Sequence, residues 1–139
     1  MTELEKSPTV KKKSCYIGAP AVFILDAACR QINAAYDYCE HAQIYQVGSS
    51  LERADWRDVD LRMMMSDADF EREFPDAQNN GAWEMDPKWS LLTAAISGHL
   101  TKITGLPIDF QFQPMTFANE RHKGRRNPMG LRIVSRRKQ

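Results

Sequence analysis

Two aspartates stand two positions apart in an otherwise apolar stretch of the chain. Asp58 and Asp60 alternate with Val59 and Leu61, and Gly48 lies ten positions before the first aspartate. Because side chains alternate along a strand, we expect both carboxylates on one face, with their Cα atoms roughly 6.5 Å apart. Like charges this close repel each other, so the pair favours a cation between them. Hydrated Mg²⁺ is the usual cation in such sites.

A third carboxylate lies in a later stretch of the same polarity. Asp109 alternates there with apolar residues, and the glutamines that follow continue the polar side of the pattern. If strands over 57–65 and 107–113 are neighbours in one sheet, Asp109 approaches Asp58 and Asp60 on the open face. Acidic side chains are poor strand formers, so three of them on one face predict a metal site.

The turn before the aspartates has the composition of an anion-binding turn. Gly48 lets the backbone approach a ligand closely, and the hydroxyl and N–H groups of Ser49 and Ser50 are suited to phosphate oxygens. A helical turn that begins near Ser50 would add the attraction of its N-terminal dipole. The turn is therefore expected to hold a triphosphate beside two metal ions roughly 3.5–4 Å apart, which is the arrangement for an in-line displacement.

Positive charges at two places are candidates for the same phosphates. Arg62 lies on the face of the aspartates, where a phosphate contact and a structural ion pair are equally consistent with its position. Arg125 and Arg126 follow a glycine in the segment 119–128. Guanidinium groups match phosphates bidentately, so this segment is expected to complete the triphosphate site or to hold a nucleic-acid acceptor. A solvated basic tail is the alternative.

Composition restricts the class of protein. The chain has 139 residues, 42% hydrophobic and 27% charged, which fits one compact globular domain. It contains no apolar run of the roughly 18 residues that a membrane span needs and no apolar signal segment at its start, so we expect a cytoplasmic protein without membrane association. The three cysteines lack CxxC spacing and indicate reduced thiols.

Charge divides the chain into three parts. Residues 1–14 are rich in lysine and are expected to be disordered, residues 15–113 form the folded domain, and residues 114–139 form a basic C-terminal extension. The net charge of +1 conceals an acidic middle between two basic ends. This distribution suits a protein that holds cations in its middle and phosphates at its edge.

Hydrophobic periodicity predicts the elements that position these residues. Long amphipathic helices are predicted over 21–39 and 87–103, strands over 43–47, 57–65 and 107–113, a short helix over 67–74, a loop over 76–86, and a helical turn and strand over 116–123 and 131–134. This order predicts an α/β (α+β) fold with a small mixed sheet and helices packed on one face.

Gly48, Ser49, Asp58, Asp60 and Asp109 together resemble the pattern of the nucleotidyltransferase superfamily that includes DNA polymerase β. The pattern is Gly-Ser at a strand end, a spacer of about ten residues, Asp-hydrophobic-Asp-hydrophobic, and a carboxylate on a later strand. The resemblance implies that Asp58 and Asp60 bind the catalytic metals. It also implies that Asp109 completes the site and favours deprotonation of the attacking hydroxyl, while Gly48 and Ser49 hold the nucleotide phosphates.

The resemblance also implies an activity. The family moves a nucleoside monophosphate from an NTP such as ATP to a hydroxyl and releases pyrophosphate, with two Mg²⁺ ions or with Mn²⁺ in their place. The acceptor stays open between nucleic acid and protein. The helical domain that often follows this unit is missing, so a separate helical partner chain and a homodimer are both open. The alternative is a catalytically silent relative that binds nucleic acid or a partner protein.

Overall fold

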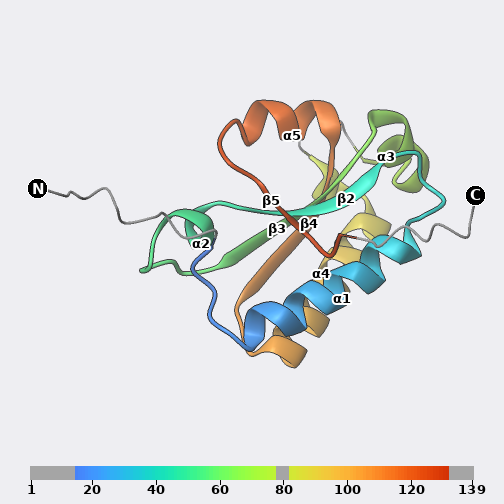
Figure 1. Ribbon diagram of the computed structural model, residues 1–139. Helices are drawn as coiled ribbons and strands as arrows, with labels where there is room; N and C mark the ends of the chain where they lie inside the picture. The colour runs from blue at the N-terminus through green and yellow to red at the C-terminus, as the bar shows by residue number, and fades with distance from the viewer. Residues whose placement is uncertain (1–14, 78–81, 132–139) are drawn as a thin grey trace, which may run out of the picture.

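A four-stranded mixed sheet forms the centre of the computed structural model, which describes residues 15–77 and 82–131 (Figure 1). The strands lie in the order β4–β3–β2–β5. Strand β2 pairs antiparallel with both β3 and β5, whereas β4 runs parallel to β3. The strands span Ala42–Val47 (β2), Val59–Met65 (β3), Ile108–Pro114 (β4) and Asn127–Met129 (β5).

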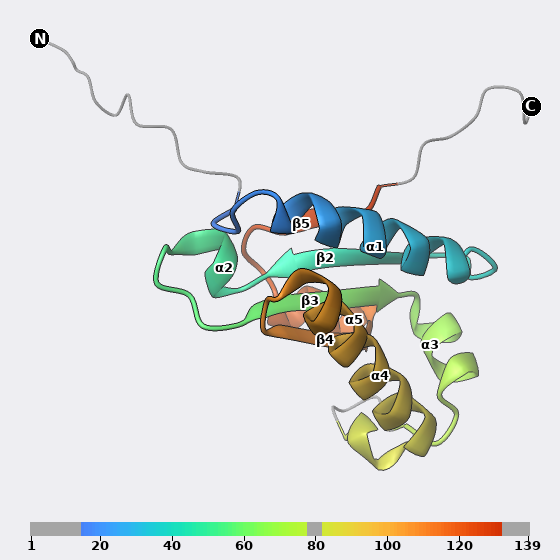
Figure 2. The same cartoon turned by 90° about the horizontal axis from the view of Figure 1, so that it is seen from below.

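Helices lie on both sides of this sheet. The long helices α1 and α4 cover one face, with α1 along β2, and the short helix α5 lies on the opposite face (Figures 1 and 2). The helices span Ala21–Ala35 (α1), Ser49–Glu52 (α2), Asp67–Glu73 (α3), Pro87–Thr104 (α4) and Met115–Arg121 (α5), and a 3-10 turn, η2, spans Trp83–Met85. The predicted α+β class with a small mixed sheet is confirmed; the long helices share one face as predicted, whereas α5 packs on the other face. Within the described ranges, no helix combines the length and apolar character required to cross a membrane.

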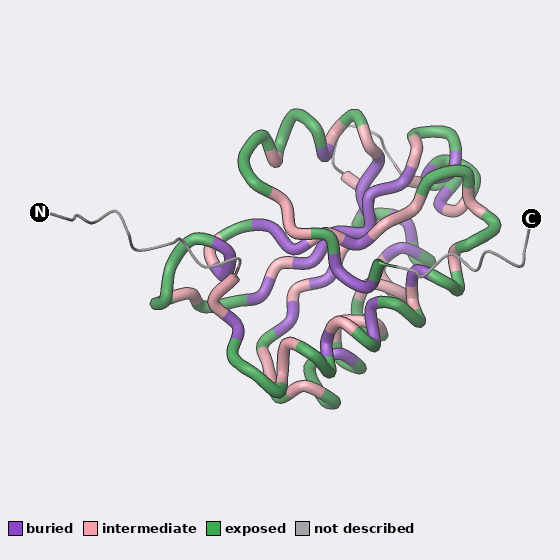
Figure 3. The backbone as a smooth tube through the Cα atoms, in the orientation of Figure 1, coloured by how far each residue is buried: buried purple, intermediate pink, exposed green. Residues whose placement is uncertain are grey.

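The main core fills the space between the sheet and the two long helices. Alternate residues of the neighbouring strands β3 and β4 point into it and are fully buried, including Leu61 and Met63 of β3 and Phe110 and Phe112 of β4 (Figure 3). Each such side chain contributes about 1.5–3 kcal/mol when it leaves water. Because side chains alternate, the polar residues of β3 and β4 must lie on the other face, beneath α5.

Local sequence signals set three of the helix ends. Ser66 caps α3 by accepting a hydrogen bond from the Asp69 N–H (3.1 Å), and Asp86 caps α4 by accepting from the Trp89 N–H (2.9 Å). Gly105 ends α4 with a left-handed φ of 75°. The prediction that the first helix extends to residue 39 was wrong, because the chain leaves the helix after Ala35 in tight turns that lead into β2.

The chain beyond residue 113 contributes to the sheet. Strand β5 pairs with β2, and the Asn33 side chain of α1 donates hydrogen bonds to the carbonyls of Met129 (3.0 Å) and Gly130 (2.9 Å). Gly130 has a φ of 67°, and a Cβ there would overlap the backbone of Arg30. The folded unit thus runs past the predicted domain boundary. The predicted disordered segment 1–14 lies outside the described residues, as does the predicted strand 131–134 apart from Leu131.

Asp69 joins α3 to the loop before β2. Its carboxylate is 1% exposed and accepts hydrogen bonds from the N–H groups of Glu40 (2.8 Å) and His41 (3.2 Å). Burial raises the pKa of Asp69, but hydrogen bonds from Ser66, His41 and Glu40 and the charge of Arg72 outweigh burial and lower it.

We expect Asp69→Asn to lower the free energy of unfolding at pH 7 by about 1–3 kcal/mol, because an amide cannot accept from both N–H groups as well as a carboxylate. A carboxyl with a lowered pKa stabilises the fold above its unfolded value of 3.8, and this is lost as the pH falls through the folded value. Urea unfolding should therefore show the difference between the two proteins shrinking as the pH falls below 3.8. A difference that stays the same from pH 7 down to the acid limit of the folded protein would contradict this role for the charge.

Candidate functional site

Asp60 and Asp109 lie side by side at the start of two parallel strands. They are register partners across β3 and β4, and the Val59 N–H, which donates to the Pro107 carbonyl (2.9 Å), anchors this register. Both carboxylates are on the sheet face beneath α5. Asp58 stands one residue before β3 and is exposed to solvent. Its charge still acts on the carboxyl of Asp60.

The Gly48 turn lies directly against Asp60. Val47, the last residue of β2, is the register partner of Asp60, and Gly48 follows with a φ of 81°. A Cβ at Gly48 would stand 2.5 Å from Asp60 Oδ2, so only glycine allows this approach. Ser49, half-buried, begins α2. Ser50 is buried and occupied, because its hydroxyl accepts a hydrogen bond from the Gln46 amide (2.8 Å).

Arg62 supplies a positive charge between the carboxylates. Its residue is 8% exposed, and its Nη2 lies 3.4 Å from Asp109 Oδ2 and 3.9 Å from Asp60 Oδ1. Nη1 donates to the main-chain carbonyls of Asp109 (2.7 Å) and Leu61 (2.9 Å). The ion pair, one of the two roles expected for Arg62, is thus the one present in the free protein. Among the described residues, its buried Nε has no hydrogen-bond partner.

A cleft of about 640 Å³ opens above these residues. Its floor is the polar face of β3 and β4, and its walls come from η2 and the C-terminal end of α5. Trp83 and Phe117 meet edge to face across the two walls, with ring centroids 4.7 Å apart. The residues that line the cleft are Val47, Gly48, Asp60, Arg62, Trp83, Glu84, Trp89, Gln111, Gln113, Phe117, Arg121 and His122.

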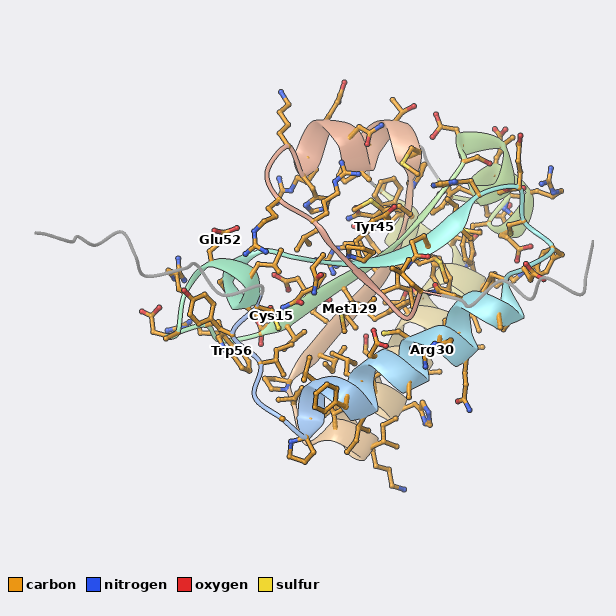
Figure 4. All side chains as sticks on the ribbon, viewed as in Figure 1. Cys15, Arg30, Tyr45, Glu52, Trp56 and Met129 are labelled. Carbon is orange, nitrogen blue, oxygen red and sulfur yellow. The ribbon has the colours of Figure 1, made fainter. Side chains whose placement is uncertain are left out.

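A smaller, basic hollow of about 270 Å³ adjoins the cleft at Gly48. Its lining includes Arg121, Lys123 and Arg125. Arg125 donates to the Leu51 carbonyl (2.7 Å), and its Nε lies 4.0 Å from Glu52, which points toward the loop after α5 (Figure 4). The cleft and the hollow together place carboxylates, an anion-tolerant glycine turn and basic side chains in one continuous depression.

Arg126, one of the predicted phosphate ligands, binds the C-terminal end of α5 in this structure. Its guanidinium donates to the carbonyls of Ala118 (3.2 Å) and His122 (3.1 Å) and to the Asn119 side chain (2.9 Å). These bonds hold the C-terminal end of α5, where the Ala118 carbonyl also accepts from the His122 N–H (2.8 Å). Arg126 thus supports α5 and lines neither the cleft nor the basic hollow.

The negative charge of the carboxylates is only partly offset by Arg62, which favours the binding of a cation. Burial raises the pKa of Asp60, Asp109 and Asp58 raise it further, and Arg62 acts in the opposite direction without overcoming them. Over residues 15–77 and 82–131, no three His, Cys, Asp or Glu side chains are grouped closely enough to hold a metal. Mg²⁺ usually takes only one or two carboxylates and completes its shell with water and phosphate. The paired Asp60 and Asp109 beside the Gly48 turn therefore fit this ion.

His122 is a site residue with no signal in the sequence. Its Nε2 lies 3.0 Å from the Gln113 side-chain oxygen, and burial together with the charges of Arg62, Arg126 and Arg121 lowers its pKa to about 4. Because this value lies below the ordinary 6.5, His122 costs the fold stability as the pH falls from 6.5 to about 4.

An anion in the cleft should offset these arginines and raise the pKa of His122 by about one unit or more. Histidine-ring NMR across a pH titration, with and without inorganic triphosphate, measures this change. A His122 pKa that is the same in both titrations would show that the anion binds elsewhere.

Comparison of the chain with known proteins identifies no relative that has this site. No known protein family, characterised protein or solved structure shows a significant match to the chain. The case for a function therefore depends on the residues themselves.

Proposed function

We propose that this protein is a Mg²⁺-dependent nucleotidyltransferase, which moves a nucleoside monophosphate from an NTP to an acceptor hydroxyl and releases pyrophosphate. One observation carries the proposal: the positive-φ turn at Gly48 touches the carboxylate of Asp60, which is itself paired across parallel strands with Asp109. A glycine turn in contact with one of two paired carboxylates brings a phosphate site and a cation site together.

The side chains divide the work along the depression. Asp60 and Asp109, assisted by Asp58, would hold Mg²⁺, which neutralises the triphosphate and the attacking oxygen. The Gly48 turn and the basic hollow with Arg121 are suited to the leaving pyrophosphate. The aromatic walls of the cleft are suited to a nucleoside or an acceptor.

Asp109 is the proposed proton acceptor. Its side chain is 44% exposed and lies beside its register partner Asp60, which lines the cleft although Asp109 itself does not. One of its oxygens faces Arg62. A carboxylate within hydrogen-bond reach of an attacking hydroxyl can take its proton as the bond to phosphorus forms. Most of the rate would come from positioning and charge neutralisation.

Incubation with each α-labelled NTP and Mg²⁺ tests this activity, with the protein itself, RNA and DNA as acceptors. We expect transfer of label to at least one of them and its loss on chelation of the metal. Transfer that persists after chelation, or label in none of the acceptors with any NTP, would remove the proposal.

A catalytically silent binding module is the second candidate, and the Arg62 ion pair favours it. A guanidinium already neutralises part of the carboxylate pair, so the fold has no need of a metal. In that case nucleic acid should bind through Arg121 and Lys123, with an affinity that falls steeply with salt. Binding that survives Asp60→Asn and disappears in Arg121→Ala/Lys123→Ala, with no NTP turnover, would establish this function instead.

A further inference from the structure

Arg62 occupies the place where a cation would neutralise the carboxylate pair. Its Nη2 is the positive group nearest to both Asp60 Oδ1 and Asp109 Oδ2, at 3.9 and 3.4 Å. The two oxygens of Asp60 are used differently: Oδ1 faces Arg62, whereas Oδ2 faces Gly48. One positive charge and two carboxylates leave the group net negative.

The guanidinium is held with incomplete hydrogen bonding. Nη1 is fixed by two main-chain carbonyls, but the distances from Nη2 to the carboxylates are longer than those of good charge-assisted hydrogen bonds. Nε is buried and unpaired within the described part of the chain. A buried donor without a partner costs free energy, so this arrangement is not the best available to Arg62. The weak bonds to the carboxylates are the ones that can be exchanged.

We propose that Arg62 is an internal competitor of the divalent cation, whose guanidinium must withdraw from Asp60 and Asp109 before these carboxylates bind a metal ion between them. The choice of cation rests on the proposed function, but the competition does not require catalysis. Two positive groups cannot share the gap, because like charges within 4–6 Å disfavour each other strongly. Arg62 thus neutralises part of the negative charge of the empty site and raises the metal concentration at which the site fills.

Direct measurement of Mn²⁺ binding to the full-length protein, without nucleotide, tests the competition. Free Mn²⁺ is followed by electron paramagnetic resonance in the wild type and in Arg62→Gln, whose amide can still donate to a main-chain carbonyl. We expect Arg62→Gln to bind Mn²⁺ about tenfold or more tightly than the wild type, since one opposing charge has been removed beside the ion.

Arg30→Gln is the matched control. Arg30 lies on α1, on the other side of the sheet from α5, and pairs with Asp26 on the surface (Figure 4). This change removes the same charge from the protein and should leave Mn²⁺ affinity as in the wild type. Equal affinity of Arg62→Gln and wild type, or no Mn²⁺ binding by either, would overturn the proposal.

A measurement on the wild type covers the case in which Arg62→Gln does not fold. In ¹⁵N-labelled protein, the arginine Nε–H resonances report the surroundings of each guanidinium. Added Mg²⁺ should shift the Arg62 resonance and leave that of Arg30 in place; an unshifted Arg62 resonance overturns the proposal. Tighter Mn²⁺ binding without any nucleotidyl transfer would remove the proposed function and leave the competition standing.

Discussion

Asp60→Asn is expected to reduce nucleotidyl transfer at least about a thousandfold, a loss of about 4 kcal/mol of transition-state stabilisation. Oδ2 of Asp60 faces Gly48, where the phosphates are proposed to bind, and Oδ1 faces Arg62, next to the proposed proton acceptor Asp109. Loss of the Asp60 charge should therefore affect both parts of the site. The amide matches the carboxylate in shape and lacks its charge. Rates with a labelled NTP, at Mg²⁺ concentrations up to saturation, measure the effect.

The same substitution should not weaken the fold. Burial and the neighbouring carboxylates raise the pKa of Asp60, so its charged form is less favourable in the folded protein than in the unfolded chain. Removal of the charge should therefore keep or raise the thermal unfolding temperature, as happens when a functional site is strained by its own charges. Asp55→Asn, an exposed aspartate paired with Arg53, is the control and should retain full activity. Full activity in Asp60→Asn would refute the catalytic assignment.

Gly48→Ala is expected to lower transfer by about a hundredfold or more and to reduce stability by about 1–3 kcal/mol. Gly48 has a φ of 81°, which costs a residue with a side chain roughly that amount. The added methyl group also meets Asp60 Oδ2 at 2.5 Å, so the carboxylate or the turn must move. A displaced carboxylate misaligns the reacting groups, to which such chemistry is highly sensitive.

Gly98→Ala is the matched control for this substitution. Gly98 lies in α4, and a Cβ there would contact nothing within 4 Å. Alanine should stabilise this helix by up to about 1 kcal/mol and leave activity unchanged. Unfolding curves and initial rates of the two variants separate the general effect of losing a glycine from the local one. A fully active Gly48→Ala would show that the turn does not approach the reacting groups.

Local pattern predicted the fold and the faces of the strands. The alternation of Asp60 with Val59 and Leu61 was enough to place the carboxylate opposite the core, because burial of one strand face decides the orientation. The helices predicted to start at residues 67 and 87 do start there, because Ser66 and Asp86 cap them with hydrogen bonds made within a few residues.

The walls of the cleft could not be predicted in this way. Trp83 and Phe117 come together only because α5 and η2 pack over the same end of the sheet. The low pKa of His122 likewise depends first on burial under the tertiary fold and then on Arg62, which is distant in the sequence. The partners of Arg126 could not be predicted either, because a run of basic residues can bind phosphate or a helix end with the same sequence. In the structure Arg126 binds carbonyls at the end of α5.

The central claim is that the site transfers a nucleoside monophosphate, and the position of the transferred label tests it most directly. The protein is incubated with Mg²⁺ and acceptor and with the same NTP labelled either at the α- or at the γ-phosphate. We predict that the acceptor gains the α-label only, that the γ-label is recovered in pyrophosphate, and that Asp60→Asn shows neither. Transfer of the γ-label to the acceptor, or no release of pyrophosphate with any NTP, would contradict the claim.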